Sequence, residues 1–222
     1  MCGRFLLTTP AEALVELLGL DETPDVVERF NIAPTQTIGI VRLDASRTRR
    51  EWASARWGLV PSWSKEPTTR APLFNARAET AHEKPAFRAA FRRRRCLVPA
   101  SGFYEWKREG KHRQPYMFRM RGEAPFAFAG LWERWQRGRQ PPLDSCTVLT
   151  TAPNELLREV HDRMPVILPP EAYAEWLDPE RADREELLRH LRPFPATEME
   201  GRRVGHHVNS PRFDDPLCAE PV

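Results

Sequence analysis

Apolar positions recur along the chain with two different periods, and the first period is helical. In "AEALVELLG" (11–19), Leu14, Val15 and Leu18 fall on one helix face, and Gly19 is a typical helix stop. The pattern predicts a short amphipathic helix over 11–19. Helical spacing returns later in the chain, at 154–160, 171–176 and 184–191.

Most of the other apolar positions form short runs rich in β-branched and aromatic residues, which are typical of strands. Segment 107–113, with Gly110, joins two of these runs as a hairpin, and "VGHHV" (204–208) predicts a last strand. The remaining runs are "IGIVRL" (38–43), "WASARWGLV" (52–60), "RCLVP" (95–99), "GFYEW" (102–106), "PYMFRM" (115–120), "FAFAGLW" (126–132) and "SCTVLTT" (145–151).

The predicted strands outnumber the predicted helices, without the regular alternation of a doubly wound fold. The 22 prolines are spread along the chain and mark no linker. We therefore predict an α+β fold over residues 1–222 as a single domain. Its sheet is expected to be mixed, mostly antiparallel and curled or barrel-like, with peripheral helices.

The composition is that of an ordinary globular protein, with 41% hydrophobic and 29% charged residues. No stretch of consecutive apolar residues approaches the roughly 18 that a membrane-spanning helix needs. The N-terminal residues lack the apolar core of a signal peptide. The four cysteines lack the paired spacing of a zinc site or a disulfide framework. We therefore expect a cytoplasmic protein in a reducing compartment.

The net charge is only +3, but it is unevenly distributed. Segment 11–30 is acidic, with Arg29 as its single basic residue, whereas 88–95 contains the run Arg92-Arg93-Arg94-Arg95. Such a run is either a solvated face or a surface that attracts phosphate.

The stretch "MCGRF" places Cys2 directly behind the initiator methionine, where chain ends usually fray. Cys2 is either a small apolar residue of a docked strand or, once Met1 is removed, a residue with a free amine and a thiol on neighbouring carbons. N-myristoylation needs Gly at the second position, so the order Met-Cys-Gly excludes that modification. Both readings of Cys2 stay open at this point.

In "SGFYEW" (101–106), a carboxylate lies among aromatic residues. Strand alternation puts Phe103 and Glu105 on one face and Tyr104 and Trp106 on the other. If Phe103 faces the interior, burial also raises the pKa of Glu105 and suits it to general acid or base work. If Tyr104 and Trp106 face the core instead, Glu105 is solvated.

In "VHDRMP" (160–165), His161 closes a predicted helix. It either interacts with the helix C-terminus or serves as a second proton-transfer group, with Arg163 as a phosphate contact.

In "LFNARAET" (73–80), Asn75 and Arg77 share one face of an extended segment. They either orient an amine or carbonyl group and hold a phosphate, or act as a cap and as the partner of Glu79.

Together, these stretches resemble the motif set of the SOS response-associated peptidase family, the SRAP domain, whose members crosslink to abasic sites in single-stranded DNA. The resemblance extends over nearly the whole chain, and no motif position departs from it. It rests on "MCGRF", "FNIAPT" (30–35), "WGLVPSW" (57–63), "FNARAET", "RCLVPASGFYEWK" (95–107), "LTTAPN" (149–154), "VHDRMPVIL" (160–168), "VNS" and "DDPL".

The resemblance implies an active site in which Cys2 is the nucleophile, completed by Asn75, Glu105 and His161. It implies contacts to the DNA backbone by Arg4, Arg77, Thr150 and Arg163, and contacts near the DNA bend and the unstacked bases by Pro34 and Trp63. On this basis we expect a monomeric DNA-repair enzyme of the SOS response that binds single-stranded DNA containing abasic sites. We expect it to associate with the nucleoid when bound to DNA, and to use no cofactor, no metal and no membrane.

The chemistry of an abasic site explains an N-terminal cysteine. The ring-opened sugar is an aldehyde, and an α-amine with a pKa of about 7.7–8.0 is neutral a few hundredfold more often at pH 7 than a lysine near 10.4. The neighbouring thiol would then close a five-membered thiazolidine, a stable crosslink that protects the strand from cleavage.

Two other functions stay open. Cys2 with His161 would form a thiol peptidase, at least for the release of Met1. A non-catalytic single-stranded DNA-binding module would need only the arginine run and Trp63. A metal site at His206 and His207 is disfavoured, because adjacent side chains point apart on a strand.

Overall fold

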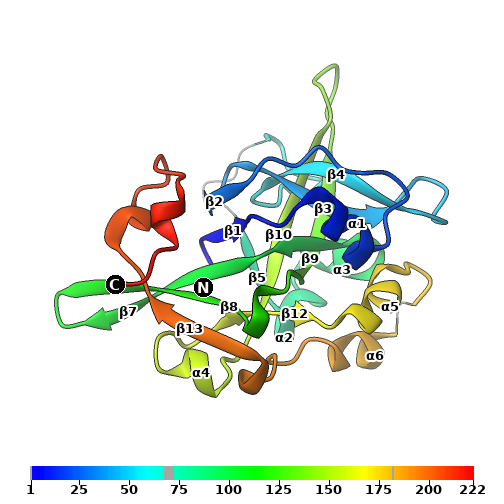
Figure 1. Ribbon diagram of the computed structural model, residues 1–222. Coiled ribbons are helices and arrows are strands. Elements are labelled where there is room, and N and C mark those ends of the chain that lie inside the picture. The colour runs from blue at the N-terminus through cyan, green and yellow to red at the C-terminus, as the bar shows by residue number, and fades with distance from the viewer. Residues whose placement is uncertain (1, 68–72, 182) are drawn as a thin grey trace.

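The computed structural model of the protein describes residues 2–67, 73–181 and 183–222. In this part of the chain the strands form two sheets, one of five strands and one of eight. Figure 1 shows the two sheets with short helices around them. No helix in the described ranges is long and apolar enough to cross a membrane.

Five strands of the larger sheet close into a barrel. In order, they are β10 (Leu143–Thr151), β4 (Arg50–Trp57), β3 (Thr37–Leu43), β6 (Arg95–Ala100) and β9 (Phe126–Trp135), and β9 pairs back with β10. The β10 and β4 pair is parallel, whereas the other neighbours are antiparallel. Closure gives each barrel strand a neighbour on both sides. The predicted mixed, mostly antiparallel and barrel-like sheet is confirmed.

Short strands extend the barrel. β5 (Asn75–Arg77) pairs in parallel with the end of β10, and β11 (Met164–Pro165) pairs antiparallel with the same end. Thr150 is opposite both Arg77 and Pro165 in these ladders. β12 (Ile167–Leu168) pairs with β9. The end of β10 therefore carries two short strands on its flanks.

The second sheet is antiparallel and contains the N-terminal segment. Its order is β13 (Met199–Arg203), β8 (His112–Met120), β7 (Gly102–Glu109), β1 (Phe5–Leu7) and β2 (Arg29–Ile32). The Phe5 ring contacts Trp57 and Phe128 of the barrel edge-on, with ring centroids 5.1 and 5.9 Å away. One apolar core therefore joins the two sheets and anchors β1.

The first predicted helix is confirmed as α1 (Ala11–Leu18), and Gly19 ends it in the left-handed region, with φ of 62°. The three later helical patterns form the shorter helices α4 (Glu155–Arg158), α5 (Tyr173–Leu177) and α6 (Arg184–Arg189). The remaining α-helices of the described chain are α2 (Ala78–Ala81) and α3 (Arg88–Arg93).

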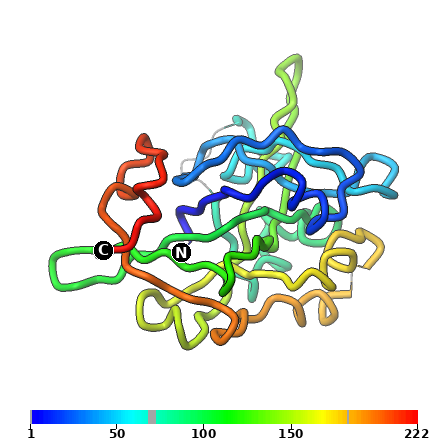
Figure 2. Tube along the Cα trace, viewed as in Figure 1, coloured from blue at the N-terminus to red at the C-terminus, as the bar shows by residue number. Residues whose placement is uncertain are grey.

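The strand predicted at 204–208 is wrong. Residues His206–Asn209 form a 3-10 turn, and the last strand, β13, comes just before it. Val204 and Val208 are both buried in a small apolar cluster with Tyr104 and Met117. Two apolar residues spaced by four fit one helical turn as well as alternate strand positions, so their spacing does not distinguish the two structures. Figure 2 shows the C-terminal segment, in red, beside the hairpin of β7 and β8.

The arginine run is not a uniform surface. Arg95 is buried and donates hydrogen bonds to five main-chain carbonyl oxygens, and burial lowers its pKa to about 10. Arg94 pairs with the buried Glu133. Arg92 and Arg93 are exposed. The run therefore contains two structural residues and two solvated ones. The carbonyl acceptors of Arg95 belong to Phe91, Arg92, Trp176, Asp178 and Arg181.

Candidate active site

Cys2 is fully buried directly before β1. The Asn75 side-chain amide donates a hydrogen bond of 2.6 Å to the Cys2 carbonyl oxygen. β1 pairs with β7, with Phe5 opposite Phe103, and the Tyr104 amide donates to the Arg4 carbonyl. Continued by two residues, this antiparallel register brings the start of the chain alongside Glu105.

Asn75 lies on β5 and is held in place by the parallel ladder with β10. On this strand Ala76 is buried, whereas its neighbours Asn75 and Arg77 are half-buried and exposed, respectively. The prediction that Asn75 and Arg77 share a face is therefore confirmed. Glu79 does not pair with Arg77; its carboxylate accepts two hydrogen bonds from Arg163 instead.

Glu105 is buried, with 2% of its surface exposed. Phe103 faces the main core on the same side of β7, which confirms the interior reading of Glu105. Tyr104 is buried as well, because the C-terminal segment covers the opposite face of the strand. Burial raises the pKa of Glu105 from its ordinary 4.5 to about 7.

His161 follows α4, and its Nε2 atom is 3.9 Å from Oε2 of Glu105. Its main-chain amide donates to the Leu157 carbonyl, so it also ends the helix. His161 Nδ1 lies 3.0 Å from the Arg163 amide, 3.0 Å from the Asp162 carboxylate and 3.2 Å from the Arg163 carbonyl, so these groups fix the ring while Nε2 faces Glu105. Burial lowers the pKa of His161 and favours the neutral ring.

Electrostatics keep the Cys2 thiol protonated. Burial raises its pKa well above the ordinary value, and the nearby Glu105 carboxylate raises it further. A cysteine that acts as a ready nucleophile has a lowered pKa, usually beside a cation or a helix N-terminus. Cys2 therefore does not resemble the thiolate of a cysteine peptidase. It is a neutral thiol beside a carboxyl group that can exchange protons near pH 7.

The arginines expected to contact DNA lie on different segments. Arg77 is exposed beside Thr150 in the β5 and β10 ladder, and Arg163 Nη2 donates to the Thr150 carbonyl over 2.5 Å. The Thr150 side chain is buried, with its hydroxyl 3.4 Å from Arg163 Nη2. Arg4 precedes β1 and is half-buried.

Pro34 and Trp63 lie in turns. Pro34 is half-buried between β2 and β3, next to Thr35, whose φ of 76° is unusual for a residue with a side chain. Trp63 is 67% exposed in the segment that follows β4. An aromatic ring exposed to this extent offers a stacking surface for an unpaired base.

Two residues that hold the guanidinium groups of Arg4 and Arg163 were not predicted to do so from the sequence. Asn31 accepts a hydrogen bond from Arg4, and Glu79 pairs with Arg163. Asn31 belongs to the quoted stretch "FNIAPT", which marked its region without indicating a role.

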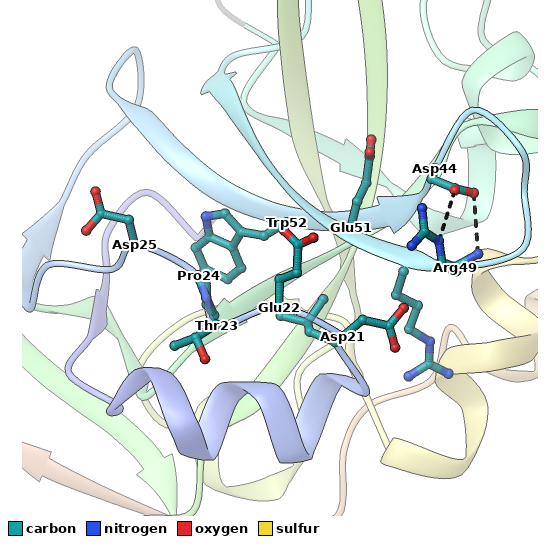
Figure 3. A pocket seen from close by; sticks show the side chains of 11 residues that line it. Asp21, Glu22, Thr23, Pro24, Asp25, Asp44, Arg49, Glu51 and Trp52 are labelled. Atoms are coloured by element: carbon teal, nitrogen blue, oxygen red, sulfur yellow. Dashed lines mark hydrogen bonds and ion pairs between the residues drawn. The ribbon is translucent and has the colours of Figure 1, made fainter.

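The hollow shown in Figure 3 is a separate feature. It has a volume of about 380 Å³ and lies beside the hairpin of β3 and β4, with an ion pair between Asp44 and Arg49 at its rim. None of the expected catalytic or DNA-binding residues lines it. Five of the eleven residues that line it are acidic and two are arginines, a net negative charge that repels a phosphate backbone.

The fold and the site define the class of protein: the chain belongs to the SOS response associated peptidase (SRAP) family, which matches residues 1–211. It is 41% identical over 224 residues to "Abasic site processing protein YoqW" of Bacillus subtilis, with 99% of each chain covered. It is 31% identical over 192 residues to "Abasic site processing protein YedK" of Escherichia coli, with 83% of each covered. A crystal structure of a Bacteroides thetaiotaomicron protein matches with a TM-score of 0.86 at 25% identity, covering all of both chains.

Proposed function

We propose that this protein processes abasic sites by forming a covalent thiazolidine with them through Cys2, after removal of Met1, in single-stranded DNA. The observation that carries the proposal is the convergence of Asn75, Glu105 and His161 on a cysteine at the start of the chain. The names of the relatives in Bacillus and Escherichia support the substrate.

In the first step, the α-amine of Cys2 attacks the aldehyde carbon of the ring-opened sugar. The carbinolamine that results loses its hydroxyl group as water and becomes an imine. A carboxyl group with a pKa near 7 is populated in both protonation states at neutral pH, so Glu105 can deliver the proton that the leaving hydroxyl needs. Glu105 recovers its proton in the second step, and His161, with Nε2 3.9 Å from Oε2 of Glu105, lies next to the carboxyl group during both transfers.

In the second step, the Cys2 sulfur attacks the imine carbon and closes the five-membered ring. The imine formed in the first step is protonated, because its nitrogen has kept one hydrogen. The thiol proton is taken up by the Glu105 carboxylate, and the nitrogen ends as a neutral secondary amine. The amine and the thiol each lose one hydrogen, which leave with the aldehyde oxygen as one water. Because both nucleophiles belong to one residue, ring closure is intramolecular and gains by orders of magnitude over the bimolecular reaction.

Asn75 would position the nucleophile without consuming it. Its amide binds the Cys2 carbonyl oxygen and so leaves the α-amine and the thiol for the reaction. Arg4 and Arg77 would bind phosphates, Arg163 would do so in exchange for its pairing with Glu79, and Trp63 would stack on a base. Such contacts read no base edges, so we expect strong salt dependence and little sequence preference.

The test is intact mass spectrometry of the purified protein before and after incubation with a single-stranded oligonucleotide that carries one abasic site. The expected product lacks Met1 and has gained the mass of the oligonucleotide minus one water. Cys2→Ala must abolish the gain. Acetylation of the α-amine with the thiol intact must abolish it as well.

The outcomes separate the three functions. If crosslinking survives acetylation, the thiol reacts alone and the thiazolidine mechanism is wrong. A chain that removes its own Met1 but gains no mass is a thiol autopeptidase. If wild type and Cys2→Ala bind the oligonucleotide with equal affinity and neither gains mass, the protein is a DNA-binding module.

A further inference from the structure

Arg4 is a half-buried cation without an acidic partner. Its Nη1 atom donates to Asn31 Oδ1 over 2.9 Å and to the Val208 carbonyl over 2.8 Å, and its Nε donates to the Gly3 carbonyl over 3.2 Å. Within the described residues, no carboxylate forms an ion pair with it, and its hydrogen bonds to the protein use Nε and Nη1, not Nη2. One edge of the guanidinium is fixed by neutral groups, while its charge and its outer nitrogen remain for a ligand.

Asn31 is the residue that organises this arrangement. It is fully buried, and its Oδ1 accepts the hydrogen bond from Arg4. Its Nδ2 donates to the carbonyl oxygens of Ser210 and Phe213, over 2.9 and 2.6 Å. A single side-chain amide therefore connects the cation beside Cys2 to the C-terminal segment, 205–218.

Other contacts hold the C-terminal segment near Arg4. Asp214 accepts hydrogen bonds from the main-chain amides of Phe30 and Asn31, over 2.6 and 2.9 Å. Asn209 accepts from the Trp106 indole over 2.7 Å, and the Arg4 guanidinium carbon lies 5.8 Å from the Trp106 ring centroid. Asn209 and Asp214 belong to the stretches "VNS" and "DDPL", which the proposed reaction steps do not use. These contacts place both stretches near Arg4.

We propose that Asn31 is a positioning residue for Arg4, and that the C-terminal segment serves to hold the guanidinium so that Nη2 receives a phosphate of the substrate strand. A phosphate is the ligand that this arrangement fits, because the cation is fixed, lacks a countercharge and follows Cys2 by two residues, about 7 Å along an extended chain. A carboxylate in the place of Asn31 would accept from Arg4 but would neutralise it, and it could not donate to the Ser210 and Phe213 carbonyl oxygens. Fixing the side chain in advance reduces the entropy lost on binding. The inference rests on the proposed function, for which Arg4 contacts the DNA backbone.

The test measures binding apart from chemistry. Fluorescence anisotropy gives the Kd for a single-stranded oligonucleotide with a tetrahydrofuran residue, which lacks the aldehyde and cannot crosslink. The proteins are wild type, Arg4→Ala, Asn31→Ala and the double variant, each measured over a series of salt concentrations. Asn31→Ala is expected to raise Kd about threefold to tenfold and to change the Kd of the Arg4→Ala protein less than twofold.

The salt slope identifies the phosphate contact. Loss of one contact to single-stranded DNA lowers the slope of log K against log salt by about 0.7, and both single variants should show this change. Asn31→Asp serves if the alanine variant does not fold: its carboxylate neutralises Arg4, so Kd rises and the slope again falls. Gln114→Ala is the control, because this buried amide also donates to a C-terminal carbonyl, that of Val204, without contacting Arg4.

Equal effects of Asn31→Ala in the wild-type and Arg4→Ala proteins would overturn the proposal, as would an unchanged slope or a similar slope change in Gln114→Ala. Failure of the proposed function is distinguishable. It would leave these binding results intact and appear only as the absence of a crosslink with the natural abasic site.

Discussion

The burial of Glu105 makes a prediction about stability as well as catalysis. A rise in its pKa from 4.5 to about 7 means that the folded protein prefers the protonated side chain. Below pH 4.5 the folded and unfolded chains are both protonated and the group has no effect. Between pH 4.5 and about 7 the unfolded chain has released the proton that the folded chain retains, so stability falls as the pH rises. Above about pH 7 the whole cost applies, about 3 kcal/mol at 1.36 kcal/mol for each pKa unit.

Glu105→Gln removes this cost because the amide does not ionise. The difference in unfolding free energy between variant and wild type should therefore be about 2 to 3 kcal/mol more favourable to the variant at pH 8 than at pH 5. Any cost of burying the amide is the same at both pH values and cancels in this comparison. For a chain of this size, the gain corresponds to about 4 to 12 °C in Tm. The same substitution should slow crosslinking by about a hundredfold or more, because a general acid and base is lost.

Urea unfolding at pH 5 and pH 8 measures the stability, and intact mass measures crosslinking. Glu133→Gln is the matched control: it alters another buried glutamate, but it leaves Arg94 without its partner and should destabilise the protein at pH 8. If Glu105→Gln shows the same stability difference from wild type at both pH values, the carboxyl group is not kept protonated by burial and its assignment as the acid is wrong.

Three further outcomes are expected. Cys2→Ser keeps the amine but replaces the thiol, so the imine should hydrolyse or promote strand cleavage; denaturing gels should show at least a hundredfold less stable crosslink and more cleaved strand, and equal crosslink yields would contradict the role of sulfur. Trp63→Ala should weaken oligonucleotide binding by about 1 to 3 kcal/mol in anisotropy without changing Tm, since the ring is 67% exposed. Arg95→Met should lower the unfolding free energy measured in urea by about 3 to 5 kcal/mol, because Arg95 is structural. It should leave the salt dependence of DNA binding unchanged, and a shallower dependence would show that Arg95 contacts the DNA instead.

Much of the fold could be predicted because its elements have strong local periodicity. The residues of α1 fix one apolar face, and strands such as β3 and β9 are rich in β-branched and aromatic residues. Barrel closure was expected only in outline, since it depends on pairing between β9 and β10 and on packing of Phe128 against Phe5. Such contacts join distant parts of the chain and leave no local periodicity.

The candidate site was partly predictable for the same reason. Strand alternation decided between two faces for Glu105 once Phe103 was placed in the core, and it placed Asn75 beside Arg77. The hydrogen bond from Asn75 to Cys2 has no local signal, and the sequence did not indicate that Asn31 would hold Arg4. The burial of Arg95 was equally hidden, because an arginine in a basic run has the composition of a solvated face whatever it contacts.

The link between Arg4 and Val208 spans 204 positions of the chain, and this has a consequence for how the protein is made. Arg4 is synthesised 204 positions before Val208, whose carbonyl oxygen accepts its hydrogen bond. Contacts of such long range form late and slow the folding reaction. Arg4 is therefore not held in place until this late part of the chain has been made and has folded. A chain interrupted before residues 205–218 would contain Cys2, Asn75, Glu105 and His161 but would lack the carbonyl group that accepts from Arg4. Under the proposed function, backbone binding by Arg4 would therefore report that the C-terminal segment has folded.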